Sequence, residues 1–199
     1  MRLDTMAKLI VWNVISLDGY FEGTQPWNLA LHEYIWGEDL RELSLSFGEN
    51  LGLLVFGRVT YEGMAAHWQS ATDDPEIAAY MNSAPKLVAS RTLAEATWQN
   101  TEVASDIVGE LTRRKQEGER PIYVFGSAEL TDALLEAGLV DELLVGVSPV
   151  ILGAGNPLFK PADQPRPLTL LDARPLDTGA RSCGMRSRAA RARRSSIAS

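Results

Sequence analysis

The chain has one cysteine and two histidines among its 199 residues. The single thiol, Cys183, excludes an internal disulfide, and so few sulfur and imidazole groups argue against a zinc site. No run approaches eighteen apolar residues, so no membrane span is expected. An acid precedes the first apolar stretch, which is not typical of a signal peptide. These absences predict a cytoplasmic protein without a bound metal.

The residues that are present favour one folded domain with an uneven charge distribution. Hydrophobic residues make up 45% of the chain, enough for one sizeable core and too many for a disordered chain. The formal net charge is −7, but residues 180–199 contain six arginines and no acid. Residues 1–179 therefore hold 13 basic and 26 acidic residues, a net charge of −13. Such a body repels nucleic acid, so an anionic ligand must meet locally placed arginines.

Short apolar runs alternate with segments that have helical periodicity. Strands are predicted over 7–15, 51–56, 86–89, 122–125, 142–150 and 168–174. Helices are predicted over 33–50, 60–68, 75–83, 105–116 and 129–137. The last two strands have no clear helix between them. This order predicts an α/β fold with a mostly parallel sheet, helices on both faces and an antiparallel C-terminal end.

Four predicted strands end in residues suited to a phosphorylated ligand. These segments are 16–19 (SLDG), 57–60 (GRVT), 90–92 (SRT) and 126–129 (GSAE). In open α/β sheets, ligands bind at the carboxyl ends of strands, near helix N-termini. Two segments place an arginine beside a hydroxyl, which suits a phosphate monoester, and the small residues of the last let backbone N–H groups approach a pyrophosphate. Each signal alone is weak, and together they favour a nucleotide.

The order of these motifs resembles a known family. The segments SLDGYFEG (16–23), LLVFGRVTYE (53–62), KLVASRTL (86–93) and YVFGSAELTDALLEAGLVDELLVGVSPVILGAGNPLF (123–159) carry the resemblance. They are similar to the dihydrofolate-reductase-like proteins, specifically the small bacterial proteins related to the reductase domain of riboflavin biosynthesis. The resemblance spans nearly all of residues 7–179. It implies a three-layer αβα fold, NADPH as cofactor, a homodimer, and a reaction of the 5-amino-6-(5-phosphoribosylamino)uracil reductase type.

The resemblance also implies cofactor contacts, position by position. Arg58 and Thr60 would contact the 2′-phosphate and pyrophosphate, and Ser90 with Arg91 would complete a pocket that prefers NADPH to NADH. In dihydrofolate reductases the turn matching 126–127 has two glycines and a cis peptide; Ser127 replaces the second glycine, which puts the cis bond in doubt. The full implied set is Val14, Ser16, Phe21, Gly57, Arg58, Thr60, Ser90, Arg91, Thr92, Phe125, Gly126, Ser127, Ala128, Glu129 and Leu130.

The substrate side carries fewer signals. Residues 26–29 (PWNL) resemble a segment of some dihydrofolate reductases, in which an acid five positions after the Trp holds the pterin. That position is His32 here, followed by Glu33, so folate reduction is not expected. Asp18 is the candidate catalytic group, as an orienting or proton-relay residue, with a turn-forming role as the alternative. Trp27 and Glu33 are candidate substrate residues, and His32 is interpreted as a surface helix residue.

The C-terminal segment departs from the family pattern. Family members close the sheet with a strand after a Thr-Gly or Ser-Gly turn, and Thr178-Gly179 lies at the position expected for this turn. The following RSCGMR is not expected to make a well-buried strand, so residues 1–179 are assigned to the reductase domain and 180–199 to a disordered or frame-shifted tail. We assume CGN codons for the arginines and a TCN codon for Ser182. If the reading frame is then shifted by two bases at Arg181, the next codons encode two apolar residues, then Arg or Trp, then a residue that can be Tyr, which is the family pattern for the final strand. The rival interpretation is a basic arm for nucleic acid or an anionic membrane.

Besides the basic-arm interpretation of the tail, which predicts salt-dependent DNA binding, two function classes remain open from the sequence. The first is an NADPH-dependent reductase that passes a hydride to a small pteridine- or pyrimidine-like heterocycle. The second is a non-catalytic dinucleotide-binding protein, a sensor or a dimerisation module. Substrate-dependent NADPH oxidation discriminates them. A membrane or nucleic-acid partner is not expected for either.

The frame-shift hypothesis predicts a reading-frame lesion in the codons that follow Gly179. Resequencing the gene, together with the intact mass of the purified protein, checks it. Clean reads in the present frame and a matching mass would exclude a sequencing error.

Overall fold

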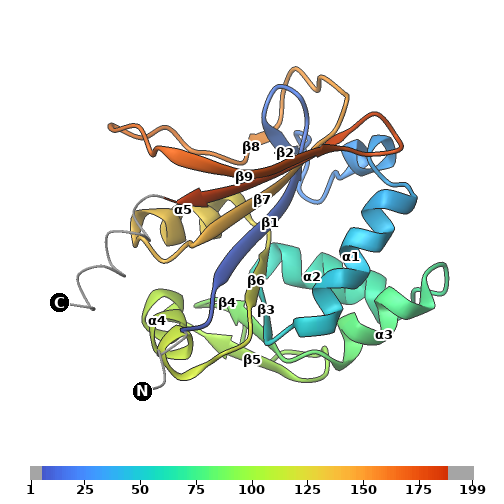
Figure 1. The fold of residues 1–199 in the computed structure, drawn as a ribbon. Coiled ribbons are helices and arrows are strands. Elements are labelled where there is room, and N and C mark those ends of the chain that lie inside the picture. The colour runs from blue at the N-terminus through green and yellow to red at the C-terminus, as the bar shows by residue number, and fades with distance from the viewer. Residues whose placement is uncertain (1–5, 188–199) are drawn as a thin grey trace.

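The computed structural model describes residues 6–187. An eight-stranded sheet runs through the molecule in the order β5-β4-β3-β6-β1-β7-β10-β9. Helices α1, α2 and α3 lie on one face of this sheet, and α4 and α5 lie on the other (Figure 1). The predicted α/β architecture with three layers is therefore confirmed.

The elements follow the predicted alternation closely. The strands up to the last crossover are β1 (Leu9–Ile15), β3 (Leu53–Gly57), β4 (Lys86–Ala89), β5 (Thr101–Ala104), β6 (Ile122–Phe125) and β7 (Glu142–Val147). The helices are a 3-10 helix η1 (Ala30–Tyr34) and α1 (Glu38–Asn50), α2 (Arg58–Trp68), α3 (Pro75–Ser83), α4 (Ile107–Glu117) and α5 (Ala128–Glu136). The C-terminal strands are β9 (Leu168–Pro175) and β10 (Arg181–Ser187), and a separate small sheet pairs β2 (Tyr20–Glu22) with β8 (Asn156–Pro157).

Parallel pairing brings the predicted strand-end motifs to one edge. Strand β1 pairs in parallel with β6 and β7, and β3 pairs in parallel with β4 and β6. Gly57 is in register with Ala89, and Trp12 is in register with Phe125. Because these strands run the same way, the segments that follow them all leave from the same edge of the sheet. The four motifs are therefore neighbours in space.

Two cores of different character fill the layers. On the α4 and α5 side the buried residues are mainly aliphatic, such as Val55, Val124 and Leu134. On the α1, α2 and α3 side the core is rich in aromatic rings, with Phe56 and Phe125 packed edge-to-face at a centroid distance of 6.2 Å. Each fully buried side chain of this size contributes about 1.5–3 kcal/mol to folding. The aromatic layer is the one that borders the candidate site.

The single helix predicted over 33–50 is wrong, because the chain breaks at Gly37. Residues 30–34 form η1, and α1 begins only at Glu38. A Cβ atom on Gly37 would lie 2.6 Å from a carboxylate oxygen of Asp177. That carboxylate accepts a hydrogen bond from the Glu38 backbone N–H at 2.9 Å and so caps α1 from a distant turn. A contact between residues far apart in the chain therefore decides where this helix begins.

Part of the segment assigned to a disordered or frame-shifted tail forms a strand, in which two of the seven residues are buried. Arg181–Ser187 forms β10, which lies between β7 and β9 and pairs antiparallel with both. Ser182 and Ser187 are buried, whereas Arg181 and Arg186 are exposed. Backbone hydrogen bonds on both sides hold the strand even though its side chains have low β-propensity. Residues 188–199, the rest of the proposed tail, lie outside the described part of the chain.

Several short strands had no sequence signal. β2 and β8 contain only three and two residues, and β5 is mostly exposed at the edge of the sheet. The strand predicted over 142–150 ends earlier, at Val147, where the chain leaves β7. Hydrophobic periodicity cannot mark strands this short or this exposed.

A buried ion pair joins α4 to the start of β7. Lys115 Nζ lies 2.5 Å from Asp141 Oδ2, and both side chains are at most 10% exposed. The same carboxylate oxygen accepts the Leu9 backbone N–H at 2.8 Å, and Lys115 also donates to the Leu139 carbonyl. Removing Lys115 takes away the cation that faces the buried Asp141 carboxylate, and breaking a buried ion pair in this way is costly.

We expect Lys115→Met to lower the free energy of unfolding by about 3–5 kcal/mol, measured by urea denaturation. The matched control is Lys8→Met, which removes the more exposed ion pair between Lys8 and Glu142. That change should cost no more than about 1 kcal/mol. Equal losses in the two variants would contradict the structural role assigned to Lys115.

Candidate functional site

The turns that follow β3 and β6 approach each other so closely that only glycine fits at two positions. A Cβ atom on Gly57 would lie 2.6 Å from Ser127 Oγ. A Cβ atom on Gly126, where φ is +55°, would lie 2.9 Å from Thr60 Oγ1. Helices α2 and α5 begin at these turns, at Arg58 and Ala128, so two helix N-termini meet here. Free backbone N–H groups at such termini favour an anion.

The peptide bond between Gly126 and Ser127 is cis. Serine at position 127, where dihydrofolate reductases have glycine, therefore does not exclude the cis form. The Ser127 hydroxyl accepts a hydrogen bond from the Leu130 backbone N–H at 3.4 Å and caps α5. Serine thus serves as the N-cap of the helix while keeping the close approach to Gly57.

The two arginines at this edge differ in their pairing. Arg58 Nη1 lies 2.9 Å from Glu62 Oε1, one helical turn further along α2. Arg91 is exposed and makes no ion pair with any described residue. The turn that carries Arg91 is shaped by Ser90, whose hydroxyl accepts hydrogen bonds from the backbone N–H groups of Thr92 and Leu93. Arg91 is therefore the arginine with its donors free for a ligand.

A cavity of about 130 Å³ opens beside these turns, on the aromatic face of the sheet. Its walls come from β1, the 21–36 segment, α1, α2, α3 and the end of β6. The lining residues are Trp12, Asn13, Val14, Phe21, Trp27, Leu29, His32, Trp36, Leu40, Ser44, Thr60, Met64, Trp68, Ile77, Tyr80, Met81, Phe125 and Gly126. Four tryptophans are among them, and such rings can stack on a flat heterocycle.

Trp27 is held in an unusual backbone conformation. Its φ is +64°, a left-handed conformation that bulky residues rarely adopt, and its N–H donates to Glu22 Oε2 at 3.0 Å. The indole packs on α2 at Gly63, where an added Cβ atom would lie 2.3 Å from Trp27 Cε2. The side chain is therefore fixed between the loop and the helix, at the wall of the cavity. Such local strain is concentrated at functional sites.

His32 lines the cavity, so its interpretation as a surface residue is wrong. Burial lowers the pKa of His32 to about 4. The imidazole is therefore uncharged at neutral pH and offers one donor and one acceptor. The next residue, Glu33, is exposed and does not line the cavity.

Asp18 lies outside the cavity lining and binds a neighbouring loop. Its carboxylate accepts hydrogen bonds from the Ser16 hydroxyl at 2.6 Å and from the backbone N–H groups of Leu152 and Gly153. The hydrogen bond from Ser16 leads the effects that lower the pKa of Asp18, and the two backbone donors add to it. The carboxylate is therefore ionised at neutral pH and holds the 16–19 turn to the 150–153 loop.

The structure brings most of the other predicted residues together. Val14, Phe21, Thr60, Phe125 and Gly126 line the cavity, and Ala128 and Leu130 are buried in the first turn of α5. The Glu129 side chain points elsewhere and pairs with Lys160.

The sequence reasoning missed most of the lining contributed by three helices. No motif includes Ser44 of α1, Met64 of α2 or Tyr80 of α3. The apolar residues next to them in the sequence predicted only that these helices pack against the hydrophobic core. A single buried polar residue, Asn13 inside the β-branched run of β1, was the one available signal. Its Nδ2 atom is buried without a hydrogen-bond partner.

Between residues 6 and 187, no group of three or more His, Cys, Asp or Glu is placed to hold a metal ion. In that same part of the chain, no helix has the length and apolarity needed to cross a bilayer.

We expect Gly63→Ala to lower the free energy of unfolding by about 1–3 kcal/mol, because the new methyl group overlaps the Trp27 indole. In a Trp27→Ala background the same change should be neutral or stabilise the helix by up to about 1 kcal/mol, since alanine favours helix over glycine. Urea denaturation of the four proteins of this double-mutant cycle measures the coupling. Additive effects would show that the indole does not pack on α2.

Residues 7–181 match the sequence profile of the RibD C-terminal domain. The YyaP protein of Bacillus subtilis (strain 168) is 27% identical over 176 residues, which cover 86% of this chain and 90% of YyaP. The fold is similar to that of RibD from Acinetobacter baumannii, with a TM-score of 0.67 and 16% identity, over 92% of this chain and 58% of RibD. It is also similar to dihydrofolate reductase from Enterococcus faecalis, with a TM-score of 0.63 and 15% identity, over 91% and 96% of the two chains. The chain belongs to the RibD C-terminal domain family.

Proposed function

We propose that the protein is an NADPH-dependent reductase that transfers a hydride to a small, flat, pyrimidine- or pteridine-like heterocycle. One observation carries the proposal: Thr60 and Gly126 belong both to the convergent helix-terminal turns and to the lining of the aromatic cavity. A dinucleotide whose pyrophosphate lay at the turns would therefore place its nicotinamide ring at the mouth of the cavity, beside Thr60 and Gly126, and leave the interior for a substrate ring. RibD and dihydrofolate reductase, which share this fold, support the assignment by analogy.

The residues at the turns fit a dinucleotide. The close approach at Gly57 and Gly126 leaves backbone N–H groups accessible where side chains would otherwise lie. The N-termini of α2 and α5 would hold the pyrophosphate. Arg91, Ser90 and Thr92 would hold the 2′-phosphate, with Arg58 contributing after it leaves Glu62. When bound, the nicotinamide supplies the hydride.

The protein's own residues act mainly by orientation. Trp27 is fixed on α2 and forms a flat wall for a ring. Asp18 holds the 16–19 turn to the 150–153 loop, and because its pKa is lowered, chiefly by the Ser16 hydroxyl, it acts as an orienting residue rather than as a proton donor at neutral pH. Water that enters the cavity mouth would deliver the proton. Glu33, being exposed, is left with a role at the cavity rim at most.

The second candidate is a dinucleotide-binding protein without turnover. The absence of a carboxylate from the described cavity lining favours it, because no acid there can protonate a substrate. Both candidates predict cofactor binding, and only the first predicts oxidation of NADPH that depends on a heterocycle. Assembly as a homodimer stays a prediction for either.

We expect the protein to bind NADPH at least about tenfold more tightly than NADH, because one charge-assisted phosphate contact stabilises a complex by about 1.5–3 kcal/mol. Arg91→Ala should remove most of this preference, and Arg58→Ala should reduce it less because Arg58 is already paired with Glu62. Tryptophan fluorescence during titration measures both affinities.

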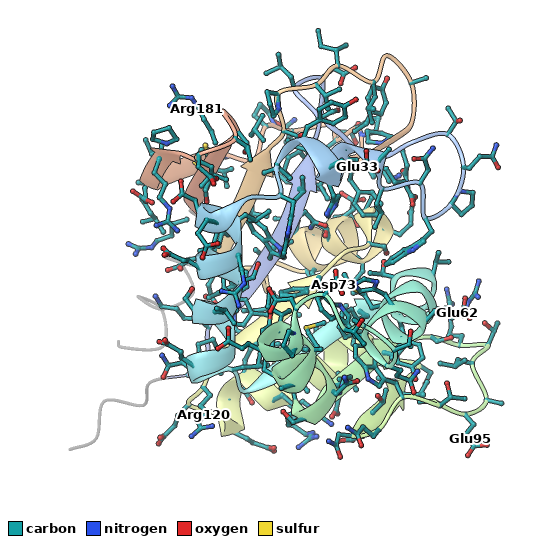
Figure 2. The ribbon with its side chains drawn as sticks, turned by 90° about the vertical axis from the view of Figure 1, so that its right-hand side faces the viewer. Glu33, Glu62, Asp73, Glu95, Arg120 and Arg181 are labelled. Carbon is teal, nitrogen blue, oxygen red and sulfur yellow. The ribbon has the colours of Figure 1, made fainter. Side chains whose placement is uncertain are left out.

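The control is Arg120→Ala, which removes the same charge at the opposite end of the molecule from Glu33 in Figure 2. It should leave the NADPH preference unchanged. Binding of neither nucleotide would overturn the proposal, and equal binding of both would remove the 2′-phosphate pocket from it.

A further inference from the structure

The cavity beside the turns has an uncharged lining. All eighteen lining residues are apolar, aromatic or neutral polar groups, apart from His32. Burial lowers the pKa of His32 to about 4, so at neutral pH this residue adds no charge. Burial also raises the pKa of the Tyr80 phenol, which therefore stays a neutral donor. A charged ligand in this cavity would lose its hydration and gain no ion pair.

The elements around the cavity offer no spare cation for a phosphate. The 20–36 segment, α1, α2, α3 and β6 contain only two arginines and no lysine. Arg41 of α1 donates to Asp74 Oδ2 at 2.7 Å and also pairs with Glu76. Arg58 of α2 pairs with Glu62. Acidic residues outnumber basic ones on these elements, so away from the N-termini of α2 and α5 their field disfavours a phosphate group.

Neutral polar groups in the cavity are nevertheless free for hydrogen bonds. Half-buried His32 makes no side-chain hydrogen bond to another described residue, and Asn13 Nδ2 is buried and unpaired. Ser44 Oγ donates to the Leu40 carbonyl and keeps its lone pairs as acceptors. These groups can pair with ring nitrogens, carbonyls and N–H groups of an uncharged heterocycle.

The volume limits the buried part of a ligand to a small ring system. A dry apolar cavity of about 150 Å³ accommodates one benzene ring. The present cavity measures about 130 Å³, so it takes roughly one six-membered ring. A ribose phosphate attached to that ring would have to extend out of the cavity, whose lining offers no cation.

Resting on the proposed function, we infer that the substrate is an uncharged, unphosphorylated aromatic heterocycle of about one buried ring, and that His32 is its specificity-determining residue. This substrate class differs from the phosphoribosylamino-uracil that the family resemblance implies. His32 acts as a neutral hydrogen-bonding group, and a carboxylate at the same position would invert the preference from neutral to cationic rings.

Three flat probes, each with one six-membered ring, test the inference: pyrazinamide is neutral, the near-isosteric pyrazine-2-carboxylate is anionic, and 4-aminopyridine is a cation at pH 7. Calorimetric titration of the whole protein, with and without saturating NADP⁺, measures their affinities. We expect pyrazinamide to bind at least about tenfold more tightly than pyrazine-2-carboxylate, because the buried anion lacks a partner. Uridine 5′-monophosphate should bind more weakly than uracil for the same reason.

The variants isolate His32. His32→Asp should weaken pyrazinamide binding and strengthen 4-aminopyridine binding at least about tenfold, whereas His32→Gln should stay within about threefold of the unmodified protein for all probes. The matched control is His67→Asp, which adds the same charge at an exposed position outside the cavity lining and should change nothing. Circular dichroism verifies that each variant is folded.

The outcomes separate this inference from the proposed function. The inference is overturned if the anion or the nucleotide monophosphate binds as tightly as its neutral counterpart, if pyrazinamide does not bind at millimolar concentration, or if His67→Asp acts like His32→Asp. If the protein prefers neutral rings but does not bind NADPH, the inference about the cavity is supported and the proposed reductase function is rejected. If the protein binds NADPH but also binds the anionic ring tightly, the proposed function is supported and the inference about the cavity is rejected.

Discussion

The close approach of two turns, at Gly57 and at Gly126, is the constraint on which the rest of the site depends. It sets the spacing between the N-termini of α2 and α5, because any side chain at either glycine would collide with Ser127 or Thr60. The parallel sheet delivers both turns to one edge, and the cavity opens where they meet. Two helix N-termini and a ring-sized aromatic cavity are thereby joined through shared residues, Thr60 and Gly126. Such a position, at the carboxyl ends of parallel strands, is where open α/β sheets bind their ligands.

The cavity differs in character from the edge beside it. At the edge, Arg91 and two helix termini favour an anion. Inside the cavity, His32 and the tryptophans form an uncharged wall, and the arginines nearby are committed to Glu62, Asp74 and Glu76. Charged and uncharged surfaces are thus separated within a short distance, the cationic one at the edge and the neutral one in the interior. The separation follows from the cost of burying an unpaired charge.

The C-terminal strands show how tertiary context overrides local preference. The sequence RSCGMRS has arginines, serines and a glycine where a buried strand calls for apolar residues, yet β10 takes its place between β7 and β9. Without β10, the backbone N–H and C=O groups along the facing edges of β7 and β9 would lack their hydrogen-bond partners. The turn that leads into β10 also carries Asp177, which caps α1. Residues 177–187 therefore support both the sheet and the helix that borders the cavity.

The sequence by itself determined the α/β class, the strand-end motifs and their common edge, because hydrophobic periodicity and turn residues are local properties of the chain. It also marked Trp27, Thr60 and Gly126 as site residues through the family resemblance. Only the tertiary structure decided that α1 begins at Glu38, that His32 faces a cavity, that Asp18 is committed to the 150–153 loop, and that β10 exists. Each of these depends on contacts between residues far apart in the chain, such as Gly37 with Asp177 and Asp18 with Gly153. Such contacts leave no periodic trace in a single sequence, because they arise only when separate elements pack together.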